Sequence, residues 1–193
     1  MTTIGMIRHG ITDWNIEGKA QGHSDIPLND KGRKQAQSVA TRLKGERWDL
    51  MISSTLSRAS ETAHIIKKTL NISNLLYDDR LREINCGKIE GLTENERIIN
   101  WGLNWREADI QMEKSQDVAM RGESTLKEII ETYEDKKILV VSHGALIGIT
   151  LQKILPQRFT NTYIDNTSIT ILNFKKGSWE CPLYNCTTHL NGS

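Results

Sequence analysis

Apolar residues in this chain form short continuous runs, separated by longer stretches in which they recur every three or four positions. Short runs are typical of buried strands, and the wider spacing is typical of helices that bury one face. The runs that predict strands are residues 4–7, 48–52, 75–77 and 138–141. Near the end of the chain, β-rich composition on both sides of a Lys176-Gly177 turn predicts a hairpin over residues 167–174 and 179–184. We expect residues 185–193 to form a frayed tail.

Four stretches have the apolar pattern of a helix: residues 30–44, 56–70, 125–133 and 145–155. In the third, Thr125 and Glu128 fit a capping box, so we expect that helix to begin after Gly122-Glu123-Ser124. Strands and helices therefore alternate along most of the chain, which favours the α/β class.

Residues 92–120 are the least regular part of the chain, with a weak helical period over residues 93–110. Long insertions next to an active site commonly act as lids and set specificity. One hypothesis is therefore that Trp101 and Trp105 line or cap a substrate pocket. Ordinary packing of a capping helix on the body of the protein is an equally good interpretation.

Composition restricts the class of protein. At 193 residues the chain is long enough for one domain with a full core and short for two, so we expect residues 1–193 to form a single domain. The 25 Lys and Arg residues balance 24 Asp and Glu residues, so no net field attracts nucleic acid or a membrane. There is no apolar run of membrane-spanning length, no signal-peptide pattern and an odd number of cysteines, three. We expect a cytoplasmic protein, monomeric or homodimeric.

The first predicted strand runs directly into Arg8, His9 and Gly10. In an open α/β sheet, ligands bind at the carboxyl ends of the strands. Arg is a permanent forked cation that matches phosphate oxygens, and Gly10 allows a substrate to approach the backbone closely. Taken alone, the segment is equally consistent with a strand end that carries an incidental surface His.

A second strand ends in the same way, because residues 138–141 are followed by Ser142, His143 and Gly144. Two imidazoles and an Arg at one sheet edge suit phosphoryl transfer through a phosphohistidine. In that chemistry one His attacks phosphorus, and the other stabilises charge on the transferring oxygens. We therefore expect His9 and His143 to face each other across one phosphate-sized gap.

At this point the sequence resembles a known family. Four motifs follow the order found in the histidine phosphatase superfamily, in its phosphoglycerate-mutase-like branch. They are Arg8-His9-Gly10 with Thr12, Trp14 and Asn15; Gln21-Gly22 through Gln35-Ala36; Ser54-x-Leu56-x-Arg58-Ala59-x-x-Thr62-Ala63; and Glu83, Gly87 and Glu90-Gly91. The resemblance extends to about residue 174 and is strongest to the short bacterial broad-specificity phosphatases. It implies a three-layer sandwich, with a mostly parallel central sheet and helices on both faces.

The resemblance also implies roles for individual residues. The catalytic set would comprise His9 as nucleophile, Glu83 as general acid, and Arg8, Arg58 and a protonated His143 on the phosphate oxygens. The substrate-binding set would comprise Asn15, Gln21, Gly22 and Gly144. No metal and no cofactor are expected, because Arg and His already supply positive charge. The expected partner is a small phosphorylated metabolite.

Departures from the family pattern leave the substrate open. Ile11 stands where Glu or Gln is usual, and Ile89 stands where Trp is common. A cofactor-dependent phosphoglycerate mutase and a non-catalytic phosphate-binding protein of the same fold remain alternatives. The motifs of other enzyme mechanisms are absent. There is no Asp-x-Asp motif of an aspartyl-phosphate phosphatase, no Cys with an Arg six positions on as in a cysteine phosphatase, no P-loop Lys and no HExxH. Cys181, Cys186 and His189 have unusual spacing and no fourth ligand for zinc.

Overall fold

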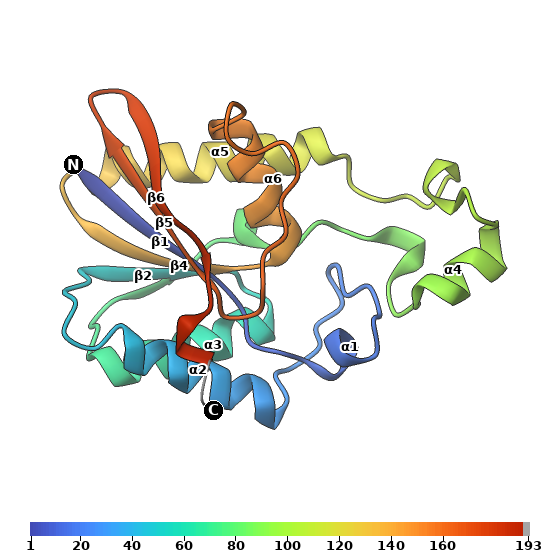
Figure 1. Cartoon of the computed structure of the whole chain (residues 1–193), viewed down its shortest axis with the longest axis horizontal. Helices are drawn as coiled ribbons and strands as arrows, with labels where there is room; N and C mark the ends of the chain where they lie inside the picture. The colour runs from blue at the N-terminus through green and yellow to red at the C-terminus, as the bar shows by residue number, and fades with distance from the viewer. Residues whose placement is uncertain (191–193) are drawn as a thin grey trace.

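The structure is a computed structural model that describes residues 1–190. At its centre is a six-stranded sheet with the strand order β3-β2-β4-β1-β5-β6 (Figure 1). The strands are β1 (Thr2–Arg8), β2 (Leu50–Ser53), β3 (Leu75–Tyr77), β4 (Lys137–Ser142), β5 (Ile169–Lys175) and β6 (Ser178–Cys186). β1, β2, β3 and β4 pair in parallel, whereas β5 and β6 form the predicted antiparallel hairpin beside β1. The predicted mostly parallel sheet is confirmed.

Helices cover both faces of this sheet, so the predicted three-layer sandwich is also confirmed (Figure 1). The helices are α1 (Asp13–Ile16), α2 (Asp30–Arg42), α3 (Ser57–Leu70), α4 (Glu94–Trp101), α5 (Ser115–Thr132) and α6 (Gly144–Ile154). Short 3-10 turns are η1 (Asp79–Leu81), η2 (Gly87–Ile89), η3 (Trp105–Glu107) and η4 (Thr188–Leu190). Helices α2 and α3 lie on one face, and α5 and α6 lie on the other.

The two-residue period of the central strands explains how both faces become buried. In β4, Ile138 and Val140 join the cluster under α5 and α6, whereas Leu139 and Val141 join the cluster over α2 and α3. All four are fully buried. A strand covered on both faces needs apolar residues at every position, which is why β4 reads as a continuous apolar run.

Helix α5 differs from the prediction, because it begins at Ser115 rather than after Ser124. Thr125 lies inside the helix, and its hydroxyl donates a hydrogen bond to the Arg121 carbonyl at 2.8 Å. Gly122 is buried where α5 packs against α6, and a Cβ there would lie 2.0 Å from Thr150 Oγ1. The predicted capping box is therefore wrong: Gly122 serves close helix packing, and that packing outweighs the poor helix propensity of Gly.

The end of the chain also differs from the prediction. Residues 185 and 186 complete β6, and η4 packs against α2. The Asn185 side chain accepts a hydrogen bond from Asp165 N and donates one to Asp165 Oδ2, each at 2.8 Å. The frayed-tail prediction is wrong for residues 185–190, since these contacts hold them, and residues 191–193 lie outside the described residues.

The segment of residues 92–120 projects from one end of the sheet, with α4 at its far side (Figure 1). Trp105 is buried within this segment: its indole N–H donates to Glu94 Oε1 at 2.9 Å, and the Arg106 guanidinium lies 4.1 Å from its ring centre. These contacts favour the packing interpretation for Trp105, whereas Trp101 is only half-buried. Across residues 1–190, no helix has the length and apolar character needed to cross a membrane.

Candidate active site

Two neighbouring parallel strands bring the predicted histidines together. Arg8, the last residue of β1, pairs in register with Ser142, the last residue of β4. His9 and His143 follow them, and their ring centres lie 5.1 Å apart. Both imidazoles are almost completely buried. The expected convergence of these two residues at one sheet edge is therefore present in the structure.

The hydrogen bonds of His9 determine which nitrogen carries its proton. His9 Nδ1 lies 2.7 Å from the Gly10 carbonyl oxygen, which can only accept. The proton is therefore on Nδ1, and Nε2 retains a lone pair. Burial, together with the nearby Arg58 and Arg8 charges, holds the pKa of His9 well below its usual range. His9 is therefore neutral at physiological pH, as a nucleophile requires.

Like His9, His143 is held in its neutral form. Its Nε2 lies 2.8 Å from Ser54 Oγ, which also accepts a hydrogen bond from Leu56 N. Burial and the Arg58 charge hold the pKa of His143 well below its usual range. The protonated His143 expected on the phosphate oxygens stays a prediction, because burial and the two arginines oppose its charge until a bound anion offsets them.

Arg58 lies in the first turn of α3 and is completely buried. Its Nη2 donates to the Gly22 carbonyl and its Nη1 to the Ser24 carbonyl, each at 2.8 Å. Burial lowers the pKa of Arg58 to about 10, so the guanidinium is still charged at neutral pH. The two carbonyls fix the direction in which the guanidinium points.

The loop that supplies these carbonyls is held by Glu90, which sequence reasoning noted only as part of a motif. Glu90 Oε1 accepts hydrogen bonds from His23 N and Cys86 N, at 2.8 and 3.2 Å. Glu90 Oε2 accepts from Ser24 N and Ser24 Oγ, at 2.9 and 2.6 Å. Gly22 has a φ of +50°, and a Cβ there would lie 2.0 Å from Glu90 Oε1. Only glycine fits at this position.

Arg8 approaches the site from the other side. Its Nη1 donates to the Ile164 carbonyl at 2.7 Å, and burial lowers its pKa. A Cβ at Gly144 would lie 3.3 Å from Arg8 Nε. Gly144 therefore leaves room for the Arg8 guanidinium beside the start of α6.

Three buried nitrogens of the site have no hydrogen-bond partner within residues 1–190: Arg8 Nε, Arg58 Nε and His143 Nδ1. The Gln21 carboxamide oxygen is also buried and unbonded. Buried polar atoms are almost always hydrogen-bonded, so a group of unbonded donors is typical of a ligand-binding site. Because two of the three nitrogens belong to cations, the site suits an anion.

Glu83 follows η1 and places its carboxylate at the N-terminus of α6. Oε1 accepts from Ile84 N at 3.0 Å and Leu146 N at 2.9 Å, and Oε2 accepts from Ala145 N at 3.1 Å. A carboxylate has about four acceptor positions. These contacts leave Oε2 one position that can hold a proton. Glu83 also lies within electrostatic range of Arg8 and Arg58.

Asn15 lies beside the His9 loop. Its Oδ1 accepts hydrogen bonds from Thr12 N at 3.1 Å and from Asn166 Nδ2 at 3.3 Å. Asn166 Nδ2 also donates to the His9 carbonyl at 3.0 Å. Asn166 was not a candidate from the sequence, because no motif surrounds it and its partner is far away in the chain.

The site places two facing histidines beside two arginines, and comparison with known proteins identifies the class of protein. The family model described as histidine phosphatase superfamily (branch 1) matches residues 4–187. The chain therefore belongs to the histidine phosphatase superfamily.

Individual relatives and solved structures agree with this class. The chain is 34% identical to the uncharacterized phosphatase PhoE of Bacillus subtilis, over all of this chain and 98% of that protein. It is 34% identical to phosphoglycerate mutase-like protein 4 of Arabidopsis thaliana, over 97% and 86% of the two chains. YhfR of Bacillus stearothermophilus superposes with a TM-score of 0.90 at 29% identity, over 98% and 100% of the chains. Phosphoserine phosphatase from Entamoeba histolytica, in complex with 3-phosphoglyceric acid, superposes with a TM-score of 0.85 at 32% identity, over 98% and 100%.

These findings make the chain a phosphoric monoester hydrolase of the phosphoglycerate-mutase-like fold. Among residues 1–190, no three His, Cys, Asp or Glu side chains are grouped so that they could hold a metal ion.

Proposed function

We propose that the protein hydrolyses small phosphomonoesters through a phosphohistidine on His9, without using a metal ion. The observation that carries this proposal is the hydrogen bond from His9 Nδ1 to the Gly10 carbonyl. It directs the free lone pair of Nε2 into a buried site between two guanidinium groups. A neutral, oriented imidazole beside fixed cations has the properties of a nucleophile for a phosphate dianion.

In the first half-reaction, His9 Nε2 attacks phosphorus and the bond to the ester oxygen breaks. Arg8 and Arg58 bind the non-bridging oxygens, with unbonded Nε donors already in place. His143 takes up a proton from solvent as the dianion enters, because the negative charge offsets the two arginines, and it returns that proton to solvent when inorganic phosphate leaves. Glu83 gives its proton to the departing alkoxide.

In the second half-reaction, the Glu83 carboxylate takes a proton from water while the water oxygen attacks phosphorus. The phosphorus–nitrogen bond breaks, which releases inorganic phosphate and neutral His9. Glu83 is then protonated again and ready for the next cycle. Asn15, Gln21, Gly22 and Gly144 complete the phosphate-binding set in this proposal, and Gly22 acts by keeping its carbonyl on Arg58.

The proposed substrates are small phosphorylated metabolites. One solved relative is a phosphoserine phosphatase in complex with 3-phosphoglyceric acid, which supports small anionic esters of this kind. We further propose a single domain in which residues 92–120 act as a lid over the site. A monomeric or homodimeric state, a cytoplasmic location and the absence of nucleic-acid and membrane partners stay predictions.

Trapping of labelled phosphate tests the mechanism. His9→Ala should abolish turnover. It should also abolish the acid-labile phosphoenzyme that forms during turnover and is captured by rapid quenching. His64→Ala is the matched control, because His64 is an exposed histidine on α3. Addition of EDTA should leave the rate unchanged. Full activity in His9→Ala, or loss of activity on chelation, would end the proposal.

A phosphoglycerate mutase is the second candidate, favoured by the mutase-like relative from Arabidopsis thaliana. The two activities differ in the acceptor of the phosphoryl group, which is water for a phosphatase and a second hydroxyl for a mutase. Incubation with 3-phosphoglycerate distinguishes them. We expect free phosphate to accumulate, whereas accumulation of 2-phosphoglycerate would identify a mutase.

A further inference from the structure

The backbone that carries Glu83 is held by a side chain from a different layer of the molecule. Arg121, in α5, donates from Nη1 to the carbonyls of Arg80 and Arg82, at 2.7 and 2.6 Å. Its Nη2 donates to the carbonyl of Glu83 itself at 2.9 Å. One guanidinium thus binds three carbonyls of the segment that ends at the proposed general acid.

Arg121 is in turn held by Glu113, just before α5. Its Nε bonds Glu113 Oε1 at 2.8 Å and its Nη2 bonds Glu113 Oε2 at 3.0 Å. Both side chains are largely buried, with 18% and 20% of their surface exposed. Glu113 Oε2 also accepts from Asn85 N at 3.0 Å, two residues after Glu83. The pair therefore contacts the chain on both sides of Glu83.

A second donor reaches the Glu83 carbonyl from the loop of residues 22–24. His23 Nε2 lies 2.9 Å from the Glu83 carbonyl oxygen, so this nitrogen carries a hydrogen. The neighbouring Ser24 carbonyl binds Arg58. The Glu83 backbone is therefore fixed between α5 and the loop that orients the phosphate-binding arginine, while its carboxylate is fixed on α6.

We propose that Arg121, held by Glu113, is a positioning residue for the reaction: it places Glu83 for proton transfer to the leaving group. This inference rests on the proposed function, in which Glu83 is the general acid. A general acid contributes about 10²- to 10⁴-fold in rate. A displacement of roughly 1 Å can cost about 10²-fold, so loss of the Arg121 contacts should affect proton donation strongly.

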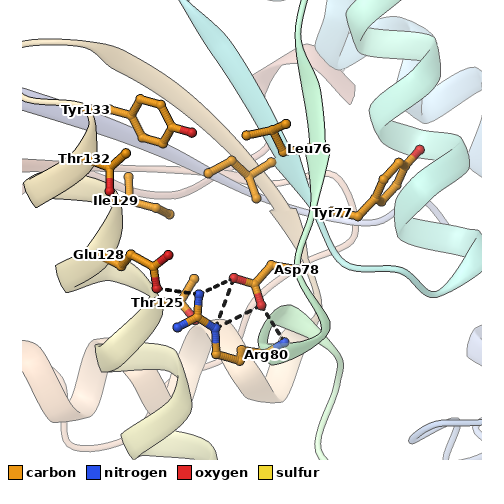
Figure 2. A pocket seen from close by; sticks show the side chains of 10 residues that line it. Leu76, Tyr77, Asp78, Arg80, Thr125, Glu128, Ile129, Thr132 and Tyr133 are labelled. Atoms are coloured by element: carbon orange, nitrogen blue, oxygen red, sulfur yellow. Dashed lines mark hydrogen bonds and ion pairs between the residues drawn. The ribbon is translucent and has the colours of Figure 1, made fainter.

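A second contact between residues 80–83 and α5 does not position Glu83. Beside a pocket between α5 and β3, the Arg80 side chain pairs with Asp78 and with Glu128, a residue of α5 (Figure 2). These groups are more exposed, with 38% of the Arg80 and 60% of the Glu128 side chain accessible. Exposed ion pairs contribute little. Glu128 therefore supplies a control on the same helix and the same segment.

The test compares two leaving groups with the variant Arg121→Met. An alkyl phosphate such as phosphoserine releases a strongly basic alkoxide, which needs a proton. p-Nitrophenyl phosphate releases a weakly basic phenolate, which does not. Because Glu83 also acts as base when the phosphoenzyme is hydrolysed, whichever ester formed it, the readout is kcat/KM, which covers only the steps up to release of the leaving group. We expect kcat/KM for the alkyl phosphate to fall about 10- to 100-fold, and kcat/KM for p-nitrophenyl phosphate to fall less than about 3-fold. Arg121→Lys keeps the positive charge but loses the planar set of N–H donors, so the rate for the alkyl phosphate should fall by an intermediate factor.

Glu128→Gln controls for general destabilisation, because it removes only the exposed contact between α5 and Arg80. It should leave the ratio of the two rates unchanged. Glu83→Gln is the reference for complete loss of the general acid, and it should show the largest fall in rate for the alkyl phosphate.

The outcomes separate this inference from the proposed function. An equal loss on both substrates in Arg121→Met, or no loss on either, overturns the positioning role. If Glu83→Gln shows the leaving-group dependence and Arg121→Met does not, only the positioning role fails. If Glu83→Gln lacks that dependence, Glu83 is not the acid and both fail. If Arg121→Met does not fold, Glu113→Gln is judged by the same criteria.

Discussion

Replacement of Glu90 by Gln tests how the loop of residues 22–24, whose carbonyls bind Arg58, is held. The substitution keeps the shape of the side chain and removes its charge. The Gln side chain can place its amide nitrogen at either carboxylate position. The loss of stability is smallest when the nitrogen takes the Oε2 position, where it faces Ser24 N and Ser24 Oγ. The serine hydroxyl can rotate to accept, but the backbone N–H of Ser24 then faces another donor. At the Oε1 position, two backbone donors, from His23 and Cys86, would lose their acceptor.

The expected magnitude follows from these contacts. A largely buried backbone N–H without a partner costs about 1–3 kcal/mol, and each remaining bond to Glu90 weakens because its acceptor is no longer charged. The sum is about 3 kcal/mol of unfolding free energy for Glu90→Gln. For a domain of this size, that corresponds to a fall in Tm of roughly 6–12 °C. Because the same loop orients Arg58, KM for a phosphomonoester should rise as well.

Thermal and urea unfolding measure the stability, and steady-state kinetics measure KM. The matched control is Glu96→Gln, because Glu96 Oε2 also accepts from a backbone N–H and a hydroxyl, those of Thr93, but is exposed. Water and the Gln carbonyl replace those contacts, so the control should keep the parent Tm. If the unfolding free energy of Glu90→Gln stays within about 0.5 kcal/mol of the parent's, the stabilisation that we assign to the contacts of the Glu90 carboxylate is refuted.

Three further predictions follow from the site and from the proposed lid. Because burial holds the pKa values of His9 and His143 well below about 6.5, unfolding takes up protons as pH falls through that value. Stability should therefore be complete above about pH 6.5 and fall below it by up to ~1.4 kcal/mol per pH unit for each imidazole. Urea titrations across this range check the slope, and an identical slope in His143→Asn would contradict the assignment. Gly22→Ala should raise KM and destabilise the fold by more than about 1 kcal/mol, because its φ is +50° and its Cβ would meet Glu90; an unchanged KM would argue against this account. Trp101→Ala should change the ranking of phosphomonoesters by kcat/KM if residues 92–120 act as a lid, and an unchanged ranking would leave Trp101 as a packing residue.

The errors in the sequence predictions have a common physical cause. Gly122 has the local signal of a helix start, yet it lies inside α5 because Thr150 of α6 leaves no space for a side chain. Asn185 has the composition of a tail, yet Asp165 holds it in place. In both cases a contact between distant parts of the chain outweighed local propensity.

Several residues of the site carried no signal of their role for a similar reason. Arg121 and Asn166 act through hydrogen bonds to backbone carbonyls. Every residue has a backbone carbonyl, so the identity of the partner leaves no trace in the sequence. The charge state of His143 was also inaccessible, because its pKa depends on burial and on Arg58.

The sequence by itself determined the α/β class and the two strand ends that carry His9 and His143, and its resemblance to a known family implied the mostly parallel sheet with helices on both faces. The α/β alternation and the strand ends follow from hydrophobic period and from short motifs, which are local. Only the tertiary structure decided which nitrogen of His9 is free, how Glu90 holds the loop under Arg58, and which side chain holds Glu83. These features depend on distances between segments far apart in the chain, and such distances exist only once the chain has folded.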